Sequence, residues 1–213
     1  MKIAVIGATG KAGSLIIQEA AARGHEVTAI VRTASKFAQS DAAVLEKDAF
    51  QLTAADLKAF DIVVNAFGAP QGEETKHVEL GKVLIEALKG ATETRLIVVG
   101  GAGSLFVDEA KTTRLFETEQ FPKEYYATAF NQGSNLNDLE SSTGIKWTFV
   151  SPAAFFNPDG KRTGSYTKGK DNFFFNAKGD SYVSYADYAI AIVDEAEQAN
   201  HVNERFAVVA EAE

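Results

Sequence analysis

Two kinds of hydrophobic pattern alternate along this chain. Short apolar runs, most of them rich in β-branched residues, predict strands at residues 2–6, 26–31, 44–45, 61–65, 95–99, 147–150 and 206–209. Apolar positions at helical spacing predict helices over residues 11–23, from Thr53, around 81–88, over 123–142 and from Tyr185 onward. Strands that alternate with helices are typical of a parallel sheet, so the pattern predicts an α/β fold with a doubly wound parallel sheet.

One segment interrupts this alternation. Residues from about 155 to 183 are rich in Gly, Phe, Asn and Lys and show no clear period. The length of 213 residues suits one domain with a substantial core. We therefore expect a single domain over residues 1–213, with residues 153–184 forming a small loop region in its C-terminal third.

Composition narrows the chemistry. The net charge of −8 and the lack of a basic run argue against a nucleic-acid partner. The chain has no cysteine, and its three histidines show no ligand spacing, so we expect no disulfide and no metal site. The apolar start is too short for a signal peptide or a membrane span, which predicts a cytoplasmic protein without a membrane partner. Nothing in the pattern predicts an oligomeric state.

The most informative motif follows the first predicted strand. Gly7, Gly10 and Gly13 stand at the first, fourth and seventh places of the segment Gly7-Ala8-Thr9-Gly10-Lys11-Ala12-Gly13. Gly7 permits a sharp turn, Gly10 lets the backbone approach a pyrophosphate, and Gly13 lets the helix pack closely. The free N–H groups of the helix start then face the phosphates, so the motif predicts a dinucleotide site. The alternative is a glycine-rich turn that binds nothing.

The end of the second strand bears on the choice of cofactor. NAD-selective sites place an acidic residue roughly 20 residues after the loop, whereas this chain has Arg32 there. A guanidinium suits a 2′-phosphate, so we expect NADP, with NAD as the alternative. Arg32 and Lys36 would otherwise be solvated surface charges. Further along, Asp48 is a candidate acceptor for the adenine amino group or else a turn or helix-capping residue.

Several segments together resemble the atypical short-chain dehydrogenases/reductases, a family with an NAD(P)-binding Rossmann fold. They are Gly7–Gly13, Val31-Arg32, Asn65–Gly68, Val98–Ser104, Trp147–Ala153, Ser184–Ala189 and His201 with Arg205-Phe206. Within that family the chain is most similar to the NADH-flavin reductase group, relatives of biliverdin-IXβ reductase. The resemblance covers nearly the whole chain.

The resemblance implies positions for both halves of the site. It places the cofactor at Gly7, Ala8, Thr9, Gly10, Lys11, Ala12, Gly13, Arg32, Asp48, Ala49, Ala66, Phe67, Gly68 and Gly100. It also places Ser104 and the turn at residues 151–156 near the nicotinamide. We expect the loop region 153–184 to lie on the substrate side.

The larger short-chain family reduces carbonyls with a Tyr-x-x-x-Lys pair on one helix face. Tyr125 and Tyr126 lie on the expected helix but are followed four residues later by Ala129 and Phe130. The literal match Tyr166–Lys170 lies in a stretch that we interpret as a turn or hairpin. A flat conjugated acceptor spreads the charge of an added hydride and does not require such an acid, so the absence favours a planar acceptor, such as FMN or FAD acting as substrate.

Candidate residues for this chemistry are few. Phe155 and Phe156 follow a strand end, where ligands bind in open sheets, and are candidates to stack on the acceptor. Ser104 and Tyr126 are the candidate catalytic residues. The leading hypothesis is an NADPH-dependent reductase of a flavin or similar ring. The alternatives are a non-catalytic NAD(P)-binding redox sensor and a carbonyl or quinone reductase.

Overall fold

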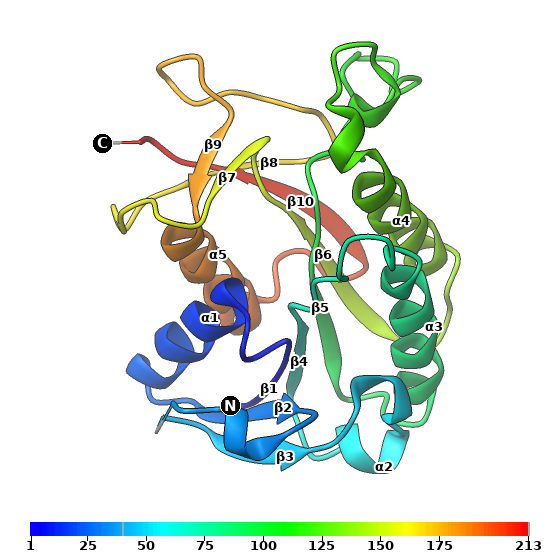
Figure 1. Ribbon diagram of the computed structural model, residues 1–213, viewed down its shortest axis with the longest axis vertical. Coiled ribbons are helices and arrows are strands. Elements are labelled where there is room, and N and C mark those ends of the chain that lie inside the picture. The colour runs from blue at the N-terminus through cyan, green and yellow to red at the C-terminus, as the bar shows by residue number, and fades with distance from the viewer. Residues whose placement is uncertain (40, 213) are drawn as a thin grey trace.

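A sheet of eight strands runs through the molecule, as the computed structural model of residues 1–39 and 41–212 shows (Figure 1). Its strand order is β3-β2-β1-β4-β5-β6-β10-β8. The strands are β1 (Lys2–Ile6), β2 (Glu26–Val31), β3 (Ala43–Glu46), β4 (Ile62–Asn65), β5 (Arg95–Val99), β6 (Lys146–Ser151), β8 (Thr167–Gly169) and β10 (Glu204–Val209). Every pair is parallel except β10–β8, so the predicted doubly wound parallel sheet is confirmed, with one antiparallel edge strand added.

Helices cover both faces of the sheet. They are α1 (Lys11–Ala22), α2 (Ala54–Leu57), α3 (Lys76–Lys89), α4 (Lys123–Glu140) and α5 (Tyr185–Gln198). Helices α1 and α5 pack together on one face, and α3 packs on α2 and α4 on the other (Figure 1). Within the described residues, no helix combines the length and the apolar character needed to cross a membrane.

The strand sequences explain this layering. In β1, Ile3 and Val5 belong to the core beneath α1 and α5, whereas Ala4 and Ile6 belong to the core beneath α3 and α4. Successive side chains of a strand point to opposite faces, so a strand that is covered on both sides is apolar at nearly every position. This is why the central strands appear in the sequence as uninterrupted apolar runs.

The chain order creates a crevice at the middle of the sheet. From β1 the chain builds β2 and β3 on one side, and it then returns to place β4 on the other side. Ile6 at the end of β1 pairs with Ile30 of β2 and with Asn65 of β4. Ligands of open α/β sheets bind at such a switch point, outside the carboxyl ends of the strands.

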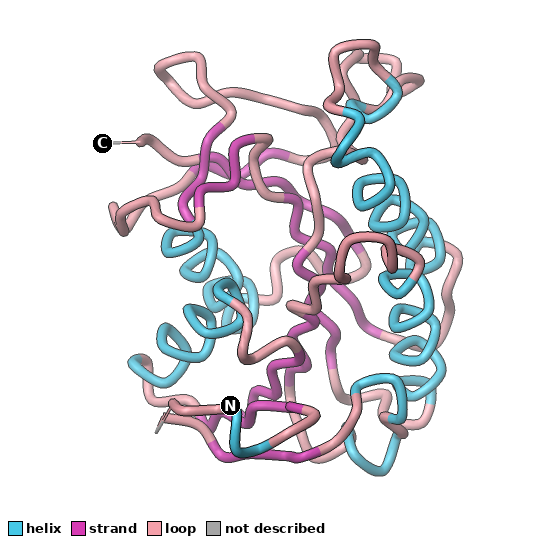
Figure 2. The backbone as a smooth tube through the Cα atoms, viewed as in Figure 1, coloured by secondary structure: helices cyan, strands magenta, loops and turns pink. Residues whose placement is uncertain are grey.

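The segment 153–184 is more ordered than its sequence suggests. It contains β7 (Phe155–Asn157), β8 and β9 (Tyr182–Ser184), and β7 pairs with β9 in a separate parallel sheet of two strands. The interpretation of Tyr166–Lys170 as a turn or hairpin was wrong, because Thr167–Gly169 forms the edge strand β8 against the distant β10. Figure 2 shows the long connecting loops concentrated at the end of the molecule that carries these short strands.

Candidate active site

The glycine segment forms a tight turn at the switch point. Gly7 has a φ of +75°, and the Gly10 N–H donates to the Gly7 carbonyl at 2.9 Å before α1 begins at Lys11. A Cβ on Gly7 would overlap the Ala66 carbonyl oxygen, and a Cβ on Gly13 would overlap the Gly7 carbonyl oxygen. The turn, the end of β4 and the first turn of α1 are therefore in backbone contact, which only glycine at these two positions allows.

The start of α1 offers unused hydrogen-bond donors. Its N-cap is Gly10, which has no side chain to cap the helix, and the first turn carries no acidic residue. No described residue supplies an acceptor for the backbone N–H groups of Lys11 and Ala12. Free N–H groups at a positive helix end suit a pyrophosphate, so the residues present fit a dinucleotide. Around them, Ala8 is buried and Thr9 is exposed.

Arg32 directly follows β2 and is exposed. The residues described after it, up to Gln39, include no carboxylate. The neighbouring strand ends beside it, because the Lys47 N–H donates to the Val31 carbonyl at 2.9 Å. Two cations, Arg32 and Lys36, thus stand at the rim where the ribose of a bound dinucleotide would reach.

Asp48 has a defined local role. Its side chain caps the short 3₁₀ helix Ala49–Gln51 by accepting from the Phe50 N–H at 3.0 Å. Asp48 is thus a helix-capping residue in this structure, as one of the two interpretations predicted, and its contact with adenine stays a prediction. Ala49 is half-buried beside it.

The segment 65–68 forms the opposite rim. Asn65 is buried and accepts from the Phe67 N–H at 3.2 Å, while the Phe67 ring meets Phe50 and His77 edge-on, at centroid distances of 5.6 and 5.7 Å. Burial lowers the pKa of His77 below its ordinary value. A Cβ on Gly68 would meet no atom within 4 Å, so this rim is open.

The predicted catalytic residues do not meet. Ser104 is buried, and its hydroxyl and carbonyl both accept from Arg205 Nη1, at 3.1 and 3.0 Å. Ser104 lies against Gly133 of α4, whereas Tyr126 lies about 10 Å earlier along the same helix. Tyr126 is exposed and stacks on Phe130. Gly100, at the end of β5, has no room for a Cβ because the Phe149 ring fills that space.

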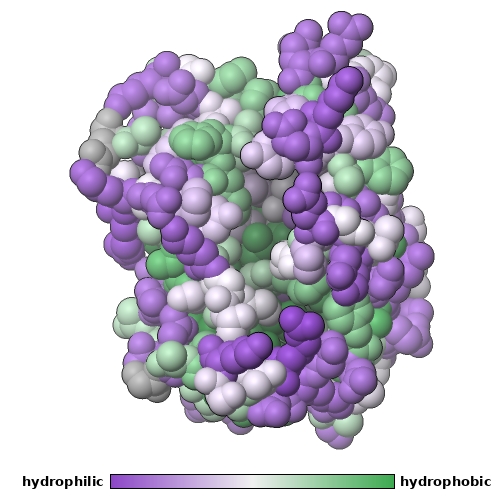
Figure 3. Space-filling view, viewed as in Figure 1, coloured by the Kyte–Doolittle hydropathy of each residue, from purple (hydrophilic) through white to green (hydrophobic). Residues whose placement is uncertain are grey.

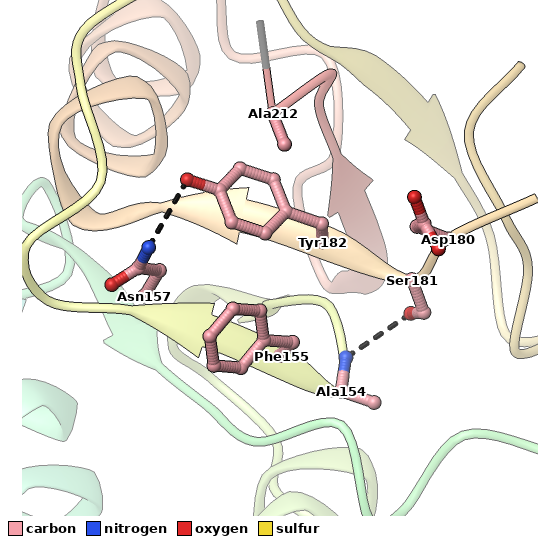
Figure 4. Close-up of a pocket in the computed structure, with 7 residues that line it drawn as sticks. All are labelled: Ala154, Phe155, Asn157, Asp180, Ser181, Tyr182 and Ala212. Atoms are coloured by element: carbon pink, nitrogen blue, oxygen red, sulfur yellow. Dashed lines mark hydrogen bonds between the residues drawn. The ribbon is translucent and has the colours of Figure 1, made fainter. Parts of the chain in front are cut away.

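Phe155 and Phe156 point to opposite sides of the small sheet. Phe156 packs on Tyr185 and Tyr188, with centroid distances of 3.9 and 4.8 Å. Phe155 is 60% exposed, tilts against Tyr182 and lines a cavity of about 760 Å³ with Asn157 and residues 180–182 (Figure 4). The two rings alternate along one strand, so they cannot both stack on the same acceptor.

The segment 158–164, which we call the strap, contacts α1 at Lys11 and Glu19 and reaches the first turn of α5. Lys11 pairs with Asp159, and Arg162 donates to Glu19 at 3.0 Å. The buried Asp187 accepts from the N–H groups of Thr163 and Gly164, each at 2.9 Å. Lys11 is therefore held toward the strap in this structure.

Tyrosines of α5 lie beside this region. Burial raises the pKa of Tyr185, and the Lys11 ammonium opposes that rise. The buried Tyr188 hydroxyl donates to the Val150 carbonyl at 2.6 Å, which ties α5 to the end of β6. Sequence reasoning singled out neither ring, because both belong to a helical apolar stripe.

The space between these groups is open. Figure 3 shows the surface hollowed, with hydrophobic residues at its floor, between the α1–α5 side and the α3–α4 side. The residues that the structure describes contain no group of three or more His, Asp or Glu side chains arranged to hold a metal ion.

Gln132 of α4 was not predicted, although it lies at the carboxyl end of β5. Its carboxamide covers Gly101, where a Cβ would overlap Gln132 Oε1. No motif or spacing in the sequence singled out this residue.

Comparison with known proteins places this geometry in context. Residues 7–209 match the model of the NAD(P)H-binding family. The uncharacterized protein YwnB of Bacillus subtilis (strain 168) is 68% identical over 213 residues, with 100% of both chains covered. The structure of SP1627 from Streptococcus pneumoniae TIGR4, a proposed NADH-flavin reductase, is similar with a TM-score of 0.94 and 47% identity, covering 99% of this chain and 100% of that one.

A more distant structure shares the fold. ChuY from Escherichia coli O157:H7, an anaerobilin reductase, gives a TM-score of 0.75 with 20% identity, covering 98% of this chain and 97% of that chain.

Proposed function

The chain belongs to the NAD(P)H-binding family, and from this premise we propose that it is an NADPH-dependent reductase of a flavin or a similar flat conjugated acceptor. The observation that carries the proposal is the uncapped start of α1, whose free N–H groups face the crevice at the end of β1. When bound there, a reduced nicotinamide cofactor supplies the hydride. The name of SP1627 supports the same reaction class.

The acceptor follows from what α4 lacks. A ketone becomes a basic alkoxide when it takes up a hydride, and it needs a positioned acid. Neither Tyr125 nor Tyr126 has a lysine four residues later, and both side chains are exposed. A flat conjugated ring spreads the added charge and takes its proton from solvent, so stacking and orientation suffice.

Phe156 and Tyr185 offer the aromatic surface next to the strap, whereas Phe155 faces the separate cavity. On this proposal Phe156 lies on the cofactor side and orients the stacked rings. Phe155 would contact an acceptor only from the outer side of the β7–β9 sheet.

The reaction is tested by mixing the protein with NADPH and FMN or riboflavin and following the loss of the reduced nicotinamide absorbance. We expect oxidation above the rate without protein. A rate equal to background with FMN, riboflavin and a bilin would contradict the reductase proposal.

The preference for NADPH rests on Arg32. A guanidinium–phosphate contact contributes about 1.5–3 kcal/mol, so Arg32→Ala should weaken NADPH binding by about 10- to 100-fold and leave NADH binding unchanged. Lys89→Ala, at the far end of α3, removes the same charge away from the site and serves as the control. Equal affinities for NADPH and NADH in the unaltered protein would refute the preference.

A further inference from the structure

Helix α4 is pressed against the loop that follows β5. A Cβ on Gly103 would lie 2.5 Å from the Ala129 Cβ, and a Cβ on Gly133 would lie 3.4 Å from the Ser104 Cβ. The helix and the loop therefore approach as closely as their backbones allow. This packing fixes where the intervening residue of the helix, Gln132, meets the loop.

Gln132 carries the only hydrogen-bonding side chain among the helix positions 129, 132, 133 and 136, which face the loop and the core beneath it. Its carboxamide is half-buried and lies over Gly101. No described residue is a hydrogen-bond partner for it. The adjacent Asn131 differs, because its Nδ2 donates to the Ala127 carbonyl at 2.8 Å. The Gln132 carboxamide is reached by solvent and is bonded to no described group, so it is free to pair with a ligand.

Gln132 lies at the end of the sheet where ligands of this fold bind. Gly100 continues the pairing of β5 with β6, since its N–H donates to the Val150 carbonyl at 2.9 Å. Gly101 is thus the second residue beyond the carboxyl end of β5, on the edge of the sheet where ligands bind. A side chain at residue 101 would occupy this space, but glycine leaves it to the Gln132 carboxamide.

We propose that Gln132 recognises the hydride acceptor through hydrogen bonds, and that the acceptor is a flat heterocycle with a lactam edge. A lactam edge is a carbonyl next to a ring N–H. This inference rests on the proposed reductase function and names the chemistry of its substrate. A carboxamide both donates and accepts, so it pairs with a lactam edge through two hydrogen bonds, as glutamine pairs with adenine. The pyrimidine ring of a flavin and the end rings of a bilin carry such an edge, whereas a quinone has no N–H.

Gln132 takes no part in proton transfer on this proposal, because an amide does not titrate near neutral pH. Its contribution is to hold the acceptor in one orientation against the nicotinamide. Its selectivity is therefore measured by comparing kcat/KM for acceptors that differ in one N–H group.

The test compares kcat/KM for riboflavin, N3-methylated riboflavin and menadione in four proteins: the unaltered chain, Gln132→Leu, Gln132→Glu and the control Asn131→Leu. We expect Gln132→Leu to lower kcat/KM for riboflavin by about tenfold or more. It should change the values for the methylated flavin and menadione less than twofold. Gln132→Glu should behave like Gln132→Leu, because a carboxylate offers no donor, and Asn131→Leu should leave all ratios unchanged.

Two kinetic results and one binding result would overturn the proposal. An equal loss with all three acceptors would assign Gln132 to the cofactor or to the fold, and no loss with riboflavin would remove its role. Quenching of riboflavin fluorescence in the presence of NADP measures binding without reduction, and so separates recognition by Gln132 from the reaction itself. If riboflavin binds, Gln132→Leu weakens this binding and no protein shows turnover, the recognition by Gln132 is supported and the reductase proposal is refuted. If riboflavin does not bind to the unaltered protein, the inference is overturned.

Discussion

The first and second halves of this chain are stabilised by different means. Asn65 is the single buried polar residue among those described up to Lys89. After Lys89, the described interior includes two arginines, an aspartate and a glutamate, namely Arg95, Arg205, Asp187 and Glu195. The first half is therefore specified by apolar packing and glycine turns, whereas the second depends on buried hydrogen-bonded charges.

Each buried charge of the second half joins segments that are distant in sequence. Arg95 of β5 donates to Glu195 of α5 at 2.8 Å, and Glu195 also meets His201 at 2.7 Å. Arg205 of β10 connects Ser104 to Asp171. Asp187 secures the strap. Irregular segments lack a regular backbone ladder, so such side chains satisfy their polar groups instead.

The largest effect should follow from breaking the Arg95–Glu195 pair. Arg95→Met leaves a fully buried carboxylate without its guanidinium, which should lower the free energy of unfolding by about 3–5 kcal/mol. Urea titration measures this change. The double variant Arg95→Met/Glu195→Gln removes both charges and should recover part of the lost stability. If the double variant is no more stable than Arg95→Met, the unpaired Glu195 carboxylate is not the cause of the loss.

Asp187→Asn should have the second-largest effect on stability. One charged acceptor of three strap hydrogen bonds is lost, and hydrogen bonds to charged groups contribute about 1.5–3 kcal/mol. We expect lower stability together with faster proteolytic cleavage within the strap. Cleavage at an unchanged rate would show that Asp187 does not hold this segment.

The matching change in the first half is Gly13→Ala. The new Cβ would overlap the Gly7 carbonyl, and such overpacking costs about 1–3 kcal/mol. Cofactor affinity should fall at least as strongly, because the turn and the helix start would separate. Gly68→Ala adds a Cβ with no atom within 4 Å and should leave the stability nearly unchanged. Equal unfolding midpoints for the two variants would contradict the close packing at Gly13.

The smallest effect concerns pH. Burial acts to raise the pKa of Asp171, but hydrogen bonds and charge from Lys111 and Arg205 outweigh it, so its pKa lies below the ordinary value of 3.8. A depressed carboxyl pKa stabilises the fold above the unfolded pKa, and the contribution is lost as the pH falls through the folded pKa. The stability difference between the unaltered protein and Asp171→Asn should therefore shrink as the pH drops from 5 toward the folded pKa of Asp171. A constant difference would exclude this linkage.

The first half was predictable because its signals are local. The apolar run at Lys2–Ile6, the glycine spacing and the Thr53–Asp56 capping box each lie within a few residues of the element they specify. The N-cap of α5 was equally local, since Ser184 accepts from the Asp187 N–H. In each case a short stretch of sequence contains both partners of the interaction.

The features that could not be predicted from the sequence depend on contacts between distant segments. The split of Phe155 from Phe156 follows from the pairing of β7 with β9, whose partners are separated by more than twenty residues. The environment of Ser104 is set by Arg205, and that of Gln132 by the glycine at residue 101. No period or spacing in the sequence indicates which of these groups would meet.

The three-residue strand β8 has a consequence for how copies of the protein behave in concentrated solution. Without it, the apolar strand β10 would end the sheet with a free row of N–H and C=O groups, a template for intermolecular β-pairing. Lys168 pairs opposite Val208 in this strand, and its ammonium lies 5.6 Å from the Phe206 ring. A short, lysine-bearing edge is a poor partner for another chain, so deletion of β8 should turn a dispersed protein into one that aggregates through β10.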